Sequence, residues 1–137
     1  MNEQLNILLV EDDEVDVMTV KRAFRQNHIS NPLFVANDGI EALEMLRGDG
    51  LPKGRRIVLL DLNMPRMNGI EFLQEVRKDP ELASLPVVVL TTSNDDQDKV
   101  KAYDLNVAGY LVKPVTFLNF CDLMVALNKY WSLVELP

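Results

Sequence analysis

The sequence predicts an α/β protein with five parallel strands in an open, doubly wound sheet. Its short apolar runs alternate with longer stretches of helical periodicity. The runs are Asn6–Val10, Leu33–Ala36, Ile57–Leu60, Val87–Leu90 and Tyr110–Val112. Most are continuously apolar, as expected for strands buried on both faces. Strands that alternate with helices favour a parallel sheet covered on both sides, and 137 residues are too few for a closed eight-unit barrel of roughly 250.

The predicted helices rest on apolar residues spaced three and four positions apart. They are Asp13–Asn27, Gly39–Arg47, Gly69–Lys78, Asp95–Leu105 and Thr116–Trp131. The fourth has the weakest pattern, in which only Val100 and Tyr103 are well placed, and the fifth has the strongest. Residues whose side chains can accept a first-turn N–H are expected to begin the helices. These are Asp13, Asn37 or Asp38, Asn68, Asn94 or Asp95, and Thr116.

Length and composition fit one soluble domain. We take residues 1–137 as a single domain, with a core at about 5–128 and a C-terminal extension at about 129–137. The net charge of -7 disfavours direct binding to nucleic acid. Cys121 is the only cysteine, so no intramolecular disulfide can form. Because the sequence shows neither a secretory signal nor a membrane-spanning apolar run, we expect a cytoplasmic location without membrane contact.

Polar side chains follow four of the predicted strands at the point where each strand ends. The residues are Glu11, Asp12 and Asp13 after the first strand, Asp61 after the third, Thr91 after the fourth and Lys113 after the fifth. Each has an ordinary alternative role, as a helix cap, a turn aspartate, a strand-end threonine or a surface lysine. However, all carboxyl ends of a parallel sheet lie on one edge, where ligands of open α/β sheets bind. The shared position therefore favours one site.

The chemistry of this group indicates phosphoryl transfer. Crowded carboxylates repel one another and recruit a cation, and a partial oxygen cage with room for water suits Mg²⁺. The only histidine, His28, lies near the end of the first helix, which disfavours zinc. A carboxylate beside Mg²⁺ can attack a phosphoryl group. Lys113 and Thr91 could then neutralise the charge on the transferred oxygens.

Four segments resemble the response-regulator receiver family of two-component signalling. They are Ile7–Asp13 (ILLVEDD), Leu59–Gly69 (LLDLNMPRMNG), Pro86–Ser93 (PVVVLTTS) and Gly109–Pro114 (GYLVKP). They span the whole domain and follow the family's order. The resemblance implies the flavodoxin-like receiver fold, a five-stranded parallel sheet in the order 2-1-3-4-5 with five helices.

The resemblance also implies how Mg²⁺ would be held. Asp61 looks like the phosphoacceptor and a metal ligand. Asp12 would bind the metal directly, and Glu11 would act through a water molecule. Asn63 would contribute its backbone carbonyl. Glu11 replaces the aspartate that often stands first in the acidic pair, a departure that leaves metal binding intact.

Three further residues match the family's pattern beyond the metal site. Thr91 and Lys113 would contact the phosphoryl oxygens. Tyr110 would be the switch aromatic, which swings inward when Thr91 moves. The Lys113–Pro114 bond resembles the family's cis peptide, which would aim Lys113 into the site.

The C-terminal segment Lys129–Pro137, with the VLTTSNDD stretch, is similar to cyanobacterial phytochrome response regulators. Apolar residues occur nearly all round the last predicted helix, which indicates a second buried surface. We expect a homodimer through the segments 95–105, 110–112 and 116–131 and the tail; the alternative is a tail that folds back on its own domain. The implied partners are a sensor histidine kinase, more narrowly a phytochrome-type kinase, and a downstream protein or phosphotransfer partner.

Three rival functions are weaker. A haloacid-dehalogenase-like phosphatase needs an aspartate two residues after its nucleophile, where this chain has Asn63. A constitutive interaction module would not need the intact set of Asp12, Asp61, Thr91 and Lys113. A flavin site lacks a phosphate-cradling loop after the first strand. The sequence therefore predicts a signalling phosphoacceptor, and an enzyme only in catalysing its own phosphoryl transfer and dephosphorylation.

Overall fold

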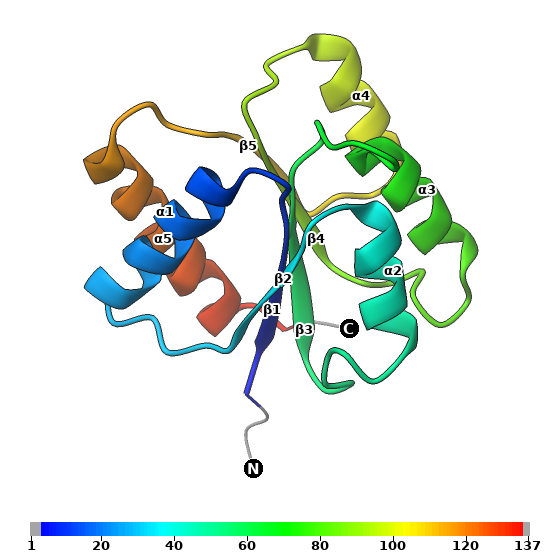
Figure 1. The fold of residues 1–137 in the computed structure, drawn as a ribbon, viewed down its shortest axis with the longest axis horizontal. Helices are drawn as coiled ribbons and strands as arrows, with labels where there is room; N and C mark the ends of the chain where they lie inside the picture. The colour runs from blue at the N-terminus through cyan, green and yellow to red at the C-terminus, as the bar shows by residue number, and fades with distance from the viewer. Residues whose placement is uncertain (1–3, 136–137) are drawn as a thin grey trace.

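The computed structural model describes residues 4–135 and shows three layers. A central sheet of five parallel strands has the order β2-β1-β3-β4-β5. Helices α1 and α5 cover one face, and α2, α3 and α4 lie on the other (Figure 1). The predicted doubly wound sheet and its strand order are therefore confirmed. No helix within residues 4–135 is long and apolar enough to cross a bilayer.

The predicted elements are all present, and their ends differ by at most two residues from the expected ones. The strands are β1 (Asn6–Val10), β2 (Leu33–Ala36), β3 (Arg56–Leu60), β4 (Val87–Thr91) and β5 (Gly109–Val112). The helices are α1 (Glu14–Gln26), α2 (Gly39–Arg47), α3 (Gly69–Lys78), α4 (Asp96–Asp104) and α5 (Phe117–Leu133).

Side chains at the predicted helix starts accept hydrogen bonds from first-turn amides. The capping residues are Asp13, Asp38, Asn68, Asp95 and Thr116. The two positions that the sequence left open are thus filled by Asp38 and Asp95. Asn68 forms a capping box with Glu71, in which each side chain accepts from the other residue's backbone N–H.

The core lies on both faces of the sheet, because successive strand side chains point to opposite sides. Leu8 and Leu60 belong to the cluster that packs under α2 and α3. Ile7 and Leu59 belong to the cluster under α1 and α5, which also holds the buried Trp131. The continuous apolar runs of β1 and β3 therefore contribute side chains to both hydrophobic clusters, one on each face of the sheet.

Helix α4 differs from the sequence prediction. Val100 and Tyr103 were expected to face the core, but they are 60% and 53% exposed. Ala102 is buried in their place. The small Ala102 side chain allows α4 to pack closely against its neighbours. The larger apolar side chains of α4 face the solvent.

Candidate functional site

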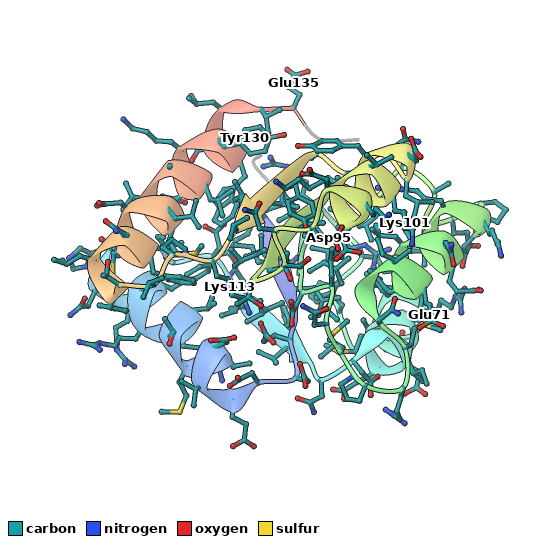
Figure 2. All side chains as sticks on the ribbon, turned by 90° about the horizontal axis from the view of Figure 1, so that it is seen from above. Glu71, Asp95, Lys101, Lys113, Tyr130 and Glu135 are labelled. Atoms are coloured by element: carbon teal, nitrogen blue, oxygen red, sulfur yellow. The ribbon has the colours of Figure 1, made fainter. Side chains whose placement is uncertain are left out.

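The carboxyl edge of the sheet gathers the polar residues that the sequence predicted. Glu11 follows β1, Asp61 follows β3, Thr91 ends β4 and Lys113 follows β5. The parallel register aligns these strand ends, with Val10 beside Leu60. Figure 2 views the molecule from this edge and shows Lys113 between the α1–α5 side and the sheet.

Three carboxylates form a cluster at this edge. Glu11, Asp12 and Asp61 each offer an oxygen atom, and these oxygens lie within 4.8 Å of one another. Glu11 and Asp61 are 2% and 6% exposed, whereas Asp12 is exposed. A cluster of hard oxygens with one open side can bind a divalent cation that keeps water ligands.

Burial and neighbouring charges change the proton affinities in the cluster. Burial raises the pKa of Glu11 from 4.5 to about 7; the Asp61 charge adds to this effect and Lys113 opposes it. For Lys113, burial disfavours the charged ammonium, but the hydrogen bonds to Asp16 and Glu11 outweigh it and raise the pKa. A bound cation would favour the charged form of Glu11.

Asp61 is held by its neighbours on both sides. Its backbone N–H donates to the Val10 carbonyl at 3.0 Å. The hydroxyl of Thr91, which is fully buried, donates to Asp61 Oδ1 at 2.8 Å. Because Oδ1 accepts this bond, the carboxylate has a fixed orientation. Topology predicted that Asp61 and Thr91 lie at one edge of the sheet, and the structure joins them by this hydrogen bond.

Lys113 contacts the cluster through Glu11 and also pairs with a carboxylate of α1. Its ammonium forms ion pairs with Glu11 and, at 2.8 Å, with Asp16. Among the hydrogen bonds of residues 4–135, none joins Lys113 to Asp61. The expectation of a cis Lys113–Pro114 bond is wrong, because no peptide bond in the described chain is cis. The Lys113 backbone N–H donates to Thr91 O at 2.8 Å, so β-type pairing places Lys113 at the site without a cis bond.

A polar cleft of about 630 Å³ opens beside the carboxylates. Asp12 and Asn63 line it, together with Glu71 of α3 and Lys101 of α4. Figure 2 shows Glu71 and Lys101 on the α3–α4 side of the same edge. The cleft gives solvent access to Asp12 and Asn63.

The β3–α3 loop, residues 61–68, is tightly constrained. Gly69 N–H donates to Leu62 O at 3.0 Å, and a Cβ at Gly69 would lie 2.6 Å from the Asp61 carbonyl oxygen. Arg66 has a φ of 63°, a conformation that costs energy for a non-glycine residue. Its guanidinium pairs with the buried Asp38. The loop that carries Asn63 is thereby fastened to the start of α2.

The opposite charge on Arg66 affects Asp38 directly. Burial alone would raise the pKa of Asp38, but the Glu41 backbone N–H and the Arg66 guanidinium together hold it below its usual value of 3.8. The ionised carboxylate is therefore favoured in the folded protein.

The β4–α4 loop, residues 92–95, connects Thr91 to Tyr110. The backbone N–H of Ser93 donates to the Thr91 hydroxyl oxygen at 3.3 Å. The Tyr110 hydroxyl donates to Ser93 O at 2.9 Å, and the Ser93 hydroxyl donates to Asp98 at 2.7 Å. Burial raises the pKa of Tyr110, although its bond to Ser93 opposes the shift. Tyr110 is thus linked to Asp61 through two residues.

Sequence reasoning missed Asp16, Arg66 and Ser93. Asp16 lies one helical turn beyond the acidic run, so its helical spacing could have placed it near the strand edge. Arg66 and Ser93 gave no such signal, because their roles depend on how two loops fold back on neighbouring elements.

The response regulator receiver domain profile matches residues 7–124 of this chain. The match covers the acidic cluster, Thr91 and Lys113. The chain therefore belongs to the response-regulator receiver family, a class of signalling proteins.

Similar proteins come from archaea and cyanobacteria. The chain is 38% identical to the probable methanogenesis regulatory protein FilR2 of Methanothrix harundinacea, over 91% of this chain and 82% of that protein. It is 34% identical to the response regulator Rcp1 of Synechocystis sp., over 96% and 92%. The crystal structure of the phosphorylated cyanobacterial phytochrome response regulator RcpA superposes with a TM-score of 0.88 at 32% identity, covering 98% of this chain and 99% of that one. A crystal structure of Rcp1 is of its Mn²⁺-bound form.

Proposed function

We propose that this protein is a cytoplasmic response regulator that accepts a phosphoryl group from a histidine kinase onto Asp61, in a Mg²⁺-dependent reaction. One observation carries the proposal. The Asp61 carboxylate is buried and oriented by Thr91, and it lies within 4.8 Å of the carboxylate oxygens of Glu11 and Asp12. The phosphorylated form of the related RcpA supports the same chemistry.

The residues fit Mg²⁺ because three carboxylates converge at a site with an open side. Asp12 and Asp61 would bind the metal directly, Glu11 through water, and Asn63 through its backbone carbonyl. When bound, Mg²⁺ supplies positive charge to the phosphoryl oxygens. The Mn²⁺-bound form of Rcp1 supports a divalent cation here.

The chain's own groups perform the transfer. The Thr91 hydroxyl orients the Asp61 carboxylate by donating to Oδ1, and one carboxylate oxygen attacks phosphorus. The new O–P bond forms as the bond from phosphorus to the kinase histidine breaks, and the histidine keeps the electron pair. Thr91 and Lys113 then donate to the phosphoryl oxygens and offset their charge.

Phosphorylation would change the β4–α4 loop. Roughly two negative charges arrive at Asp61, and the Thr91 hydroxyl turns toward them. Because the Ser93 backbone N–H donates to the Thr91 hydroxyl oxygen at 3.3 Å, Ser93 moves with Thr91. Tyr110 loses its fixed partner Ser93 O and moves inward. The phosphoryl group thus stabilises an active conformation of the face formed by α4, β5 and α5.

The same face is the proposed dimer interface. Exposed apolar side chains lie on its elements: Val100, Tyr103, Val112, Val125, Tyr130 and Leu133. An apolar groove of about 240 Å³ runs between β5 and α5 and is bordered by Leu111, Leu123 and Tyr130. A second copy would cover this surface, since β5 is an edge strand and isolated monomers rarely expose large apolar patches. Similarity to Rcp1 and RcpA supports a phytochrome-type kinase as the donor, with output through a downstream protein or a phosphorelay.

The direct test is incubation with a small-molecule acyl phosphate and Mg²⁺, followed by intact mass measurement. We expect one added phosphoryl group in the wild type and none in Asp61→Asn. Chelation of Mg²⁺ should reduce the product strongly. Asp104→Asn, a charge-matched change at an exposed position of α4, should behave like the wild type. Equal phosphorylation of Asp61→Asn would show that the acceptor lies elsewhere.

Sedimentation tests the interface. The wild type should form a dimer that weakens in Leu133→Glu and in a chain truncated after Ser132, which keeps the buried Trp131. Val15→Glu, at an exposed position of α1, is the matched control and should leave the dimer intact. A monomer in every case would remove the proposed interface without affecting phosphorylation.

A further inference from the structure

Asp16 is a carboxylate beside the site that the family resemblance does not assign. It lies in the first turn of α1, where its backbone N–H donates to the capping residue Asp13 at 3.3 Å. Its Oδ2 is 2.8 Å from Lys113 Nζ. The cap fixes the start of α1, so Asp16 is presented to Lys113 by rigid local structure.

Lys113 is shared between two carboxylates of different environments. The Glu11 side chain is 2% exposed, whereas the Asp16 side chain is 36% exposed. The Lys113 side chain itself is 9% exposed. Water can solvate the partly exposed Asp16 when the ammonium leaves, whereas the Glu11 side chain is almost fully buried. Asp16 is therefore the partner that Lys113 can give up at low cost.

Asp16 and Lys113 border open space on the α1 side, which gives water access to Asp16. A cleft of about 320 Å³ lies between α1 and the β5–α5 loop, and Asp16, Lys113 and Thr116 line it. Asp61 is meanwhile bonded to Thr91. The ammonium is thus drawn toward α1 while the phosphoacceptor is held by β4.

We propose that Asp16 is a positioning residue that holds the Lys113 ammonium away from Asp61 in the unphosphorylated protein and competes with the phosphoryl group for it. The inference rests on the proposed function. Phosphorylation moves the ammonium from Asp16 to the phosphoryl oxygens, while Glu11 keeps its contact. Removing the charge of Asp16 removes the competitor, so Lys113 reaches the phosphoryl group more readily.

The expected effect is faster phosphorylation. At a subsaturating concentration of a small-molecule acyl phosphate with Mg²⁺, Asp16→Asn should be phosphorylated up to roughly five-fold faster than the wild type, the range of a partly exposed ion pair. Glu14→Gln makes the same charge change at an exposed position in the same turn, and its rate should equal that of the wild type.

A double-mutant cycle separates positioning from general electrostatics. In a Lys113→Ala background, Asp16→Asn should no longer change the rate, because the group it positions is gone. If the Lys113→Ala proteins react too slowly for rates to be measured, the same four proteins can be compared by their affinities for beryllofluoride. This phosphoryl mimic binds without a chemical step.

Each result decides one question. A wild type that takes up no phosphoryl group overturns the proposed function. A phosphorylated wild type with an unchanged or slower Asp16→Asn overturns the role of Asp16. The same conclusion follows if Glu14→Gln gives an equal acceleration, or if the effect of Asp16→Asn persists without Lys113.

Discussion

The two loops that flank Asp61 are held in different ways. The β3–α3 loop is fixed by a close backbone approach at Gly69, by the ion pair of Arg66 with the buried Asp38 and by the capping box at Asn68. The β4–α4 loop is held chiefly by hydroxyl groups, through the bonds that link Thr91, Ser93 and Tyr110.

The difference separates two tasks. A loop fixed by a close backbone approach and by an ion pair to a buried carboxylate can keep metal ligands in place, since leaving that carboxylate without its cation is costly. A loop held by rotating hydroxyls can exchange one partner for another at small cost. The first loop therefore supports the proposed chemistry, and the second can report it to α4 and β5.

The largest effect is expected on the fixed side, at Gly69. In Gly69→Ala the new Cβ would lie 2.6 Å from the Asp61 carbonyl oxygen and 2.7 Å from Leu62 Cα, so backbone must shift. We expect a loss of about 3 kcal/mol in the free energy of unfolding, measured by urea denaturation. Gly109→Ala is the control, because its nearest neighbour, a Val88 methyl, is 4.0 Å away. Equal losses in both variants would contradict the close approach.

Arg77 anchors the C-terminal end of α4. A change in the β4–α4 loop would therefore move the N-terminal end of α4 more than its C-terminal end. Its guanidinium donates to four backbone carbonyls, those of Ala83, Leu85, Leu105 and Asn106. Arg77→Ala leaves these acceptors without their donor, and we expect a loss of about 2 kcal/mol by the same measurement. Lys78→Ala, at the exposed neighbour, should be nearly neutral. A neutral Arg77→Ala would mean that α4 is free at both ends.

The Arg66 ion pair should contribute less. Arg66→Ala leaves the buried Asp38 carboxylate without its cation, but the Arg66 side chain is 60% exposed, so we expect a loss of about 1–2 kcal/mol at pH 7. Arg47→Ala, which breaks the pair with Asp79, should cost less because the Asp79 carboxylate is more exposed than that of Asp38.

The Arg66 effect should also depend on pH. The folded pKa of Asp38 lies below 3.8, so the stabilisation is complete above 3.8 and is lost as the pH falls through the lower folded value. The difference between the wild type and Arg66→Ala should shrink in that acid range. A difference that is constant down to pH 2 would assign the effect to backbone strain at Arg66.

The smallest effect on stability is expected on the exchangeable side. Tyr110→Phe removes the bond to Ser93 O and should cost at most about 1 kcal/mol. Amides of the β4–α4 loop should nevertheless exchange hydrogen faster, and those of the β3–α3 loop should not change. Tyr103→Phe, on the exposed face of α4, should leave both loops as they are. Faster exchange in the β3–α3 loop would contradict the division between the two sides.

The fold was predictable because its signals are local and repeated. Continuous apolar strands, alternating helices and capping side chains all indicated the same architecture, and the order of the strands followed from the resemblance. The position of Asp61, Thr91 and Glu11 followed from topology alone, since parallel strands end on one edge.

The remaining features depend on tertiary contacts that leave little trace in the sequence. Ala102 rather than Val100 is buried in α4, because packing space and not apolar spacing decides that face. The ion pair of Lys113 with Asp16 joins residues 97 positions apart. Several carboxylates lie within reach of the long lysine side chain, so the sequence does not show which of them it pairs with.

The most direct measurement of the central claim is to locate the phosphoryl group. Borohydride reduces an acyl phosphate and marks the carbon that carried it, and peptide mass mapping then identifies the residue. After reaction with the acyl phosphate and Mg²⁺, we predict the mark at Asp61, in the peptide that follows β3. A mark at Asp12 or at any other carboxylate would contradict the account.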